Sequence, residues 1–221
     1  MFISKKRPII IPQFEHTRLS AAIASLWGND DFEKTTLPPD SFIKGVLFHD
    51  RGYGYLDNFP LGSLSIEQRK ATLIKGIEES FNDPIADIVT LLHIKRLTNS
   101  STMKDELTDV ALECEKVLSE KMKAVTVSET EFAFADRIVD LADSIAFDFS
   151  LEEDSEDTGK VSSRHGSNDL TPINFSIKGN IISMTPWPLS VDRYEGFIVG
   201  YHKNGYPEKL DPCIIPFILQ K

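Results

Sequence analysis

The sequence predicts a mainly α protein, built as a bundle of about six helices with a small C-terminal antiparallel β appendix. Apolar residues recur at helical spacing in most segments up to Phe149. The acidic stretch LEEDSEDTG then breaks the pattern, and from Ile173 apolar and polar residues alternate between the turns KGN and KNG. We therefore expect a helical domain at residues 1–150, an acidic flexible loop at 151–170 and a β appendix at 171–221, packed on the helical domain.

The elements follow in a simple order. RPIII, bracketed by prolines, predicts a short edge strand, and the first helix begins after Pro12. Later helices are indicated by LPPDSFIKGVLFHD, SIEQRKATLIKGIEES, DPIADIVTLLHIKRL, MKDELTDVALECEKVLSEKMKAV and SETEFAFADRIVDLADSIAFDF. Two of them start with capping boxes, Ser65 with Gln68 and Ser128 with Glu131. The last helix is apolar around most of its circumference and should be central.

Composition narrows the classes of partner. The net charge of −10 over 221 residues argues against a nucleic-acid polymer or an anionic membrane as the partner, because phosphate binding needs a concentrated basic face. Cys114 and Cys213 form no C-x-x-C pair and no disulfide framework, which is typical of a reducing compartment. No apolar run reaches the length of a signal-peptide core or a membrane span. We expect a soluble cytoplasmic protein whose oligomeric state is open.

Metal-capable side chains fall on the apolar faces of four predicted helices: His16, His49, His93 and Asp136. Asp50 directly follows His49 in FHDRGYGYLDNF, where a helix gives way to a glycine-rich turn. A buried carboxylate is costly unless it is paired, hydrogen-bonded or bound to a cation. Imidazoles and carboxylates from separate helices suit a divalent transition metal such as Mn, Fe, Co, Ni or Zn. Their coincidence predicts a shared metal site.

Each of these residues also has a simpler interpretation. A single helical histidine is more often a hydrogen-bonded core residue or a surface residue than a metal ligand. Asp50 can be a turn former, and Asp136 can pair with a neighbouring arginine. Tyr53, Tyr55 and Phe59 in the glycine-rich turn could stack on a base or line an apolar pocket, although such residues more often pack a loop onto a bundle.

The order of these residues resembles the HD-domain superfamily of metal-dependent phosphohydrolases. The matching positions are His16, then His49 with Asp50, then Asp136, and the resemblance covers roughly residues 12–149. The wider pattern QFEHTRLS, HDRGYGYLD, LLHIKRL, FADRI and PWPL also looks like an uncharacterised bacterial family of HD-like proteins with no assigned reaction. The resemblance implies that these four residues are the metal ligands.

The same resemblance implies a hydrolytic mechanism on a small phosphorylated molecule or nucleotide. The metal would lower the pKa of a bound water and offset charge on phosphoryl oxygens. His93 would bind a second metal or donate to the substrate, and Asp57 is a candidate acid/base or supporting residue. Arg51, Arg96 and Arg137 would hold phosphate, although arginines beside ligands are as often members of ion pairs.

The chain departs from the better-known members of that superfamily. Tyr53 stands where cyclic-dinucleotide phosphodiesterases have lysine, and Gly-Tyr-Gly replaces the acidic pair of alarmone hydrolases. Only His93 is available for a second metal. The sequence therefore favours a metal-dependent phosphohydrolase, with a non-catalytic metal- or ligand-binding protein as the alternative and a di-iron oxygenase of the same fold as a third hypothesis.

Overall fold

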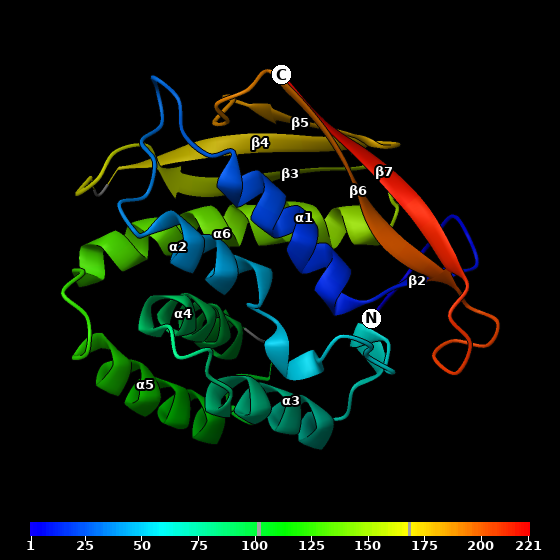
Figure 1. Cartoon of the computed structure of the whole chain (residues 1–221), viewed down its shortest axis with the longest axis horizontal. Coiled ribbons are helices and arrows are strands. Elements are labelled where there is room, and N and C mark those ends of the chain that lie inside the picture. Colours follow the sequence, from blue (N-terminus) through cyan, green and yellow to red (C-terminus); the bar gives the residue numbers. More distant parts are fainter. Residues whose placement is uncertain (101–102, 168) are drawn as a thin grey trace.

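Helices and one large sheet are arranged in layers in the computed structural model, which describes residues 1–100, 103–167 and 169–221 (Figure 1). The strands are β1 (Phe2–Ile3), β2 (Ile9–Ile11), β3 (Ser155–Ser162), β4 (Leu170–Lys178), β5 (Ile181–Thr185), β6 (Arg193–His202) and β7 (Pro212–Gln220). The α-helices are α1 (Gln13–Ser25), α2 (Pro39–Leu47), α3 (Ile66–Glu78), α4 (Pro84–Ser100), α5 (Thr108–Met122) and α6 (Glu129–Ser150). Two short 3-10 helices, η1 (Arg51–Tyr53) and η2 (Leu61–Ser63), follow α2.

The seven strands form one mixed sheet in the order β1-β2-β6-β7-β5-β4-β3. All neighbours are antiparallel except β5 and β7, which run parallel. Alternate residues of β7 are buried, as Ile215, Phe217 and Leu219 show, because successive side chains of a strand point to opposite faces. One face of the sheet is thus an apolar surface that helices cover.

The helices form two layers against this face. α1 and α6 pack on each other and contact β6 and β3, respectively, whereas α3, α4 and α5 lie on the far side of them from the sheet (Figure 1). α6 carries buried residues on most of its turns, including Phe132, Ile138 and Ile145, and is central as expected. The capping box of Ser65 and Gln68 is present at the start of α3. The Ser128 side chain accepts a hydrogen bond from the Glu131 backbone N–H at the start of α6.

The expected fold class, a mainly α helical bundle with a small β appendix, is wrong. The sheet has seven strands and draws them from both ends of the chain, since β1 pairs with β2 and β2 pairs with β6. The RPIII strand is confirmed as β2, but its local pattern could not show how many strands it would join. Strand pairing depends on contacts between segments about 190 residues apart, which periodicity does not report.

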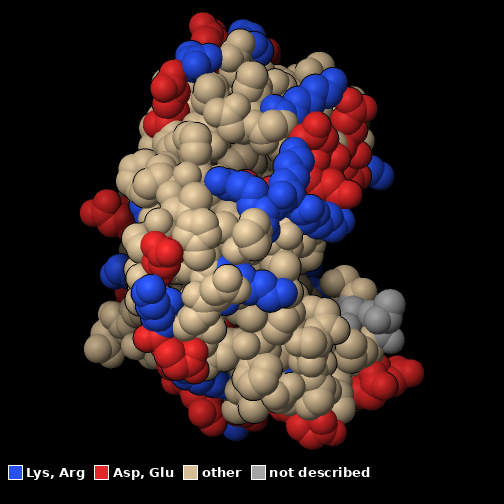
Figure 2. All heavy atoms as spheres, turned by 90° about the vertical axis from the view of Figure 1, so that its right-hand side faces the viewer, with Lys and Arg blue, Asp and Glu red and all other residues tan. Residues whose placement is uncertain are grey.

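The segment expected as an acidic flexible loop, residues 151–170, is largely ordered structure in its described part, with position 168 outside that part. Ser155–Ser162 is strand β3, which pairs antiparallel along its length with β4. The acidic residues before it pair with the basic turn between β1 and β2, and the ion pairs are Lys5–Glu153, Lys6–Asp154 and Arg7–Glu152. Figure 2 shows basic side chains gathered beside acidic ones on the corresponding face. The acidic residues therefore pair with a basic turn that lies far away in the sequence, and the acidic segment alone does not indicate this partner.

In the described part of the chain, no helix is long and apolar enough to cross a membrane.

Candidate metal centre

Five buried or half-buried polar side chains converge where α1, α4, α6 and the end of α2 meet. They are His16 on α1, His49 and Asp50 just after α2, His93 on α4 and Asp143 on α6. Two overlapping sets have ligand atoms within 4.8 Å of one another: His16, His49 and Asp143, and His49, Asp50 and His93. Four of the residues that the sequence singled out are thus brought together, and Asp143 is a fifth that it did not.

Backbone carbonyls orient two of the imidazole rings. His16 Nδ1 lies 2.6 Å from the carbonyl of Gln13, and His49 Nδ1 lies 2.7 Å from the carbonyl of Val46. A carbonyl only accepts, so both Nδ1 atoms carry a proton and donate it. In the neutral rings, Nε2 of each histidine is then an unprotonated acceptor. Hydrogen bonding of the second ring nitrogen in this way is typical of histidines that bind metals.

The unprotonated atoms point at one another. The two Nε2 atoms are 3.3 Å apart, and Asp143 Oδ1 lies 3.0 Å from that of His16 and 3.2 Å from that of His49. Metal–ligand bonds of about 2.1 Å at angles of about 90–110° separate neighbouring ligand atoms by about 3.0–3.4 Å. Asp50 Oδ2 lies 3.7 Å from His16 Nε2 and can supply a further oxygen. The three closest acceptors already have the spacing of ligands around one ion.

The ionisable side chains of His16, His49 and Asp143 are arranged so that a positive charge between them is favourable. Burial alone would lower the pKa of His49, but the charge of Asp143 and the hydrogen bond to it raise that pKa above its ordinary value. Burial would raise the pKa of Asp143, yet the charge of His49 and the close polar contacts with the imidazoles of His16 and His49 hold it well below the usual carboxyl range. Asp143 therefore stays ionised, and a proton or a metal ion must lie between it and the imidazoles.

His93 is oriented differently from the other two histidines. Arg96 Nη2 lies 3.1 Å from His93 Nδ1, and because a guanidinium only donates, Nδ1 is the acceptor. Nε2 then carries the proton and donates to Asp50 Oδ1 at 3.2 Å. Burial and the charge of His49 lower the pKa of His93, in keeping with a neutral ring. In this arrangement His93 holds Asp50 in place, and it would bind an ion through Nε2 only if Arg96 moved away.

Asp136, the aspartate that the sequence predicts as a ligand on the last helix, lies outside both metal-capable sets. Its carboxylate forms an ion pair with Arg96, which also contacts Asp140 at 2.7 Å. Asp143 follows Asp136 by seven residues, or two helical turns, and so projects from the same side of α6. That spacing is the signal that could have suggested Asp143. The sequence could not tell which carboxylate an arginine from α4 would neutralise.

Asp57, predicted as an acid/base or supporting residue, is buried outside these sets. Its carboxylate accepts a hydrogen bond from the Gln13 backbone at 3.1 Å and forms an ion pair with the amino group of Met1. It therefore ties the glycine-rich loop to the start of α1, three residues before His16. The ring of Phe2 from β1 packs edge-on against His16, with centroids 5.1 Å apart. In this way both the loop and the sheet support the position of His16.

The arginines expected to hold phosphate have other positions. Arg51 is buried and its Nη1 donates to Asp87 at 2.6 Å, while its Nε donates to the carbonyl of Gly76. Arg96 is engaged with Asp136 and Asp140, and Arg137 is exposed. Arg51 and Arg96 are therefore tied to carboxylates of the chain itself.

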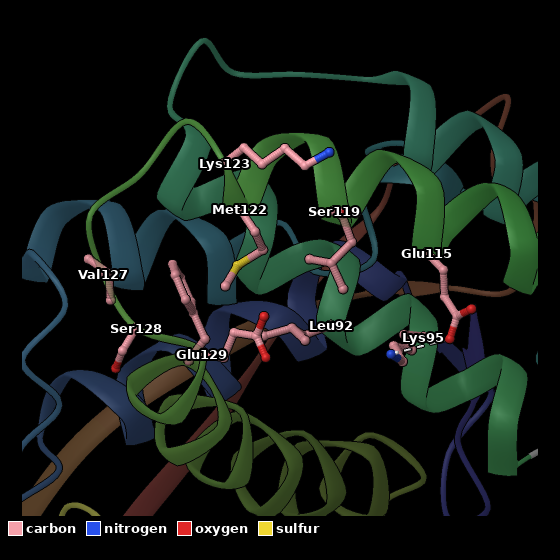
Figure 3. Close-up of a pocket in the computed structure, with 11 residues that line it drawn as sticks. Leu92, Lys95, Glu115, Ser119, Met122, Lys123, Val127, Ser128 and Glu129 are labelled. Atoms are coloured by element: carbon pink, nitrogen blue, oxygen red, sulfur yellow. Dashed lines mark ion pairs between the residues drawn. The ribbon is translucent and has the colours of Figure 1, made fainter.

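Two cavities lie near this part of the helical layers. The larger, about 600 Å³, is lined by α4, α5, the following loop and α6, and the ion pair of Lys95 and Glu115 lies in its wall (Figure 3). None of the five residues of the candidate metal centre lines it. The smaller cavity, about 280 Å³, has Asp50 in its wall. Only the smaller of these two adjoins the chemistry that the histidines and aspartates offer.

Comparison with known proteins identifies the family of this chain but assigns it no reaction. The model of a family described as a protein of unknown function, DUF3891, matches residues 3–201. Searches of curated proteins and of solved structures found no match. The expected membership of the HD-domain superfamily is wrong, because the matching family is DUF3891 and the fold contains a seven-stranded sheet instead of an HD-type helical bundle. Since the match spans most of its length, the chain belongs to the DUF3891 family.

Proposed function

We propose that this protein is a metal-dependent hydrolase that cleaves a phosphoester of a small molecule. A single divalent transition-metal ion would be held by His16, His49 and Asp143, with Asp50 as the fourth protein ligand. The observation that carries the proposal is the meeting of two Nε2 atoms and one carboxylate oxygen within 3.3 Å of one another, while both Nδ1 atoms donate to backbone carbonyls.

The ligand set suits hydrolysis. A divalent ion in such a site lowers the pKa of a coordinated water and offsets charge on phosphoryl oxygens. The protein side chains contribute position and proton handling. The carbonyls of Gln13 and Val46 fix the two rings, so little reorganisation is needed on binding. The Asp143 side chain is 18% exposed and that of Asp50 10%, so the centre can be reached from solvent on the carboxylate side.

His93 has a separate role in this proposal. Its Nε2 proton is directed at Asp50 Oδ1, and Arg96 keeps it there by donating to Nδ1. This arrangement makes His93 a positioning residue for Asp50 and a nearby source of a proton for a leaving group. It favours one ion per chain, because a second ion would have to displace the proton on Nε2.

The alternative is a metal-binding protein without turnover. The same ligands would serve a structural or ligand-sensing ion equally well, and the buried ring edge of Phe2 on His16 is compatible with a purely structural role. Turnover of a phosphoester separates the two hypotheses, whereas metal content alone does not.

The test compares two identical substitutions on α6, Asp143→Asn and Asp136→Asn. Metal content would be measured on purified protein by elemental analysis, and hydrolysis with a panel of phosphomonoesters and phosphodiesters. We expect one transition-metal ion per wild-type chain, loss of metal and activity in Asp143→Asn, and retention of metal in Asp136→Asn, whose carboxylate pairs with Arg96.

Other outcomes contradict parts of the proposal. Metal loss in Asp136→Asn with retention in Asp143→Asn would refute the ligand set. One bound ion with no hydrolysis of any ester would favour the non-catalytic alternative. Two iron ions with oxygen consumption would refute hydrolysis and the single-ion centre together.

A further inference from the structure

The cavity of about 280 Å³ beside the candidate metal centre has a distinct lining. Asp50 contributes one wall, so the cavity is continuous with the proposed ligands. Four aromatic side chains also line it, and they come from α1, the end of α2, the glycine-rich loop and the turn before α4: Phe14, Phe48, Tyr55 and Phe81. An apolar cavity of about 150 Å³ can hold benzene, so this one has room for one or two fused rings.

The four aromatic rings form a connected series along the cavity. Phe14 packs on Tyr55 with centroids 4.9 Å apart and on Phe48 at 5.7 Å, and Phe48 packs on Phe81 at 4.9 Å. Each of these contacts is tilted instead of stacked. Tyr55 is 57% exposed although it belongs to this series. An exposed aromatic side chain at the rim of an aromatic cavity is suited to stack on a planar ligand.

Arg51 adds a polar group to this lining. Its guanidinium lies 5.0 Å from the centroid of Phe81 and its side chain is 2% exposed. Nε and Nη1 donate to Gly76 and Asp87, but Nη2 is buried and has no hydrogen-bond partner among the residues that the structure describes. Because Nη2 has no accessible surface, a ligand in the cavity would not reach it, and Arg51 supports the ring of Phe81 from behind instead.

The charges around the cavity indicate how a substrate would be oriented. Asp50 and Glu79 line it, and the charge of Arg51 is already balanced by Asp87. A phosphate group inside the cavity would meet carboxylates and no unpaired cation in this lining. The phosphate is therefore expected at the metal centre, with an uncharged part of the substrate in the cavity.

We infer that this cavity binds a planar fused ring of the substrate, of the nucleobase type, that stacks on the aromatic series. The inference rests on the proposed phosphoester hydrolase, because it names the class of substrate for that centre. The ring is recognised by stacking in the cavity, and its binding does not require the metal.

The test uses equilibrium binding by calorimetry with four probes: adenosine, adenosine 5′-monophosphate, phenyl phosphate and glycerol 1-phosphate. Adenosine is titrated into chelator-treated protein, so ring binding is measured without the metal. Loss of base stacking on one aromatic side chain weakens binding about 5- to 150-fold. We expect Tyr55→Ala and Phe81→Leu to weaken adenosine and its monophosphate by about tenfold or more, with glycerol 1-phosphate unaffected.

Phe59→Ala is the matched control, because Phe59 is an exposed aromatic residue of the same loop that does not line the cavity. It should leave all four affinities unchanged. Equal affinity for adenosine 5′-monophosphate and glycerol 1-phosphate, or no effect of Tyr55→Ala, would overturn the inference. Phenyl phosphate binding as tightly as the nucleotide would overturn the assignment of a fused, nucleobase-type ring. Adenosine binding without hydrolysis of any ester would instead refute the proposed function and leave the ring site standing.

Discussion

Asp87 holds the buried arginine of the ring cavity in place, and replacing it with asparagine should destabilise the protein strongly. Its carboxylate is fully buried and accepts hydrogen bonds from Arg51 Nη1 at 2.6 Å, Lys121 Nζ at 2.8 Å and Ser80 Oγ at 2.5 Å. It also accepts from the backbone N–H of Phe81 at 3.3 Å, and so fixes a ring of the cavity. One carboxylate of α4 thus joins η1, α5 and the turn between α3 and α4.

The size of the effect follows from what the substitution leaves behind. An asparagine side chain would keep the volume but remove the charge, and the Arg51 side chain, only 2% exposed, would remain as an uncompensated buried cation. Breaking a buried ion pair by removing one partner costs about 3–5 kcal/mol. For a domain of about 150–250 residues, each kcal/mol lowers the melting temperature by about 2–4 °C. We therefore expect Asp87→Asn to melt about 6–20 °C below the wild type.

Thermal unfolding followed by circular dichroism would measure the melting temperature, and urea unfolding would measure the loss of unfolding free energy. The control is Asp109→Asn, because the Asp109 carboxylate pairs with Lys70 at 2.9 Å but is 66% exposed. An exposed pair contributes little, so its unfolding midpoint should match the wild type. A loss of less than about 1 kcal/mol in Asp87→Asn would refute the view that Arg51 depends on this carboxylate.

Two further predictions concern stability near the same site. Burial alone would raise the pKa of Asp87, but hydrogen bonds from Lys121, Ser80 and Arg51 lower it. The ionised carboxylate therefore contributes fully to the free energy of unfolding above the ordinary carboxyl pKa of about 4, and this contribution is lost as the pH falls further. The stability difference between wild type and Asp87→Asn should therefore be constant near neutral pH and shrink below about pH 4, as unfolding across a pH series would show; a constant difference down to about pH 2 would contradict this sign. A Cβ at Gly52 would lie 2.1 Å from the carbonyl oxygen of Thr72, so Gly52→Ala should cost about 1–3 kcal/mol or more in urea unfolding. Gly62→Ala, where a Cβ meets nothing within 4 Å, is its control, and equal midpoints for the two would show that η1 moves freely.

Much of the candidate site could be predicted from the sequence. Their spacing places His16, His49 and His93 on apolar helix faces, and all three lie in the cluster. Helical spacing could not decide whether Asp136 or Asp143 is the metal ligand, because both lie on the same side of α6. What separates them is Arg96, which reaches Asp136 from α4. The partner of a carboxylate on another helix is a tertiary contact, and spacing along one helix carries no information about it.

Local sequence patterns were sufficient to predict most of the individual helices and the first long-range strand. Helical spacing and caps place the helices, including the capping box at Ser65, and the pattern of RPIII correctly predicts a strand. Periodicity is a local property, and each of these elements depends on residues within a few turns. The same local pattern identifies His49 and Asp50 as a pair where α2 ends.

The architecture and the chemistry of the candidate metal centre depend on contacts between segments far apart in the sequence. The sheet joins β2 near the start of the chain to β6 near its end, and the acidic run before β3 is ordered by basic residues of the first turn. Likewise, the carbonyls of Gln13 and Val46 and the guanidinium of Arg96 determine which nitrogen of each histidine is free. Strand partners and hydrogen-bond partners are set by which surfaces meet on folding. That is why most residues of the centre could be named from the sequence, whereas their roles required the fold.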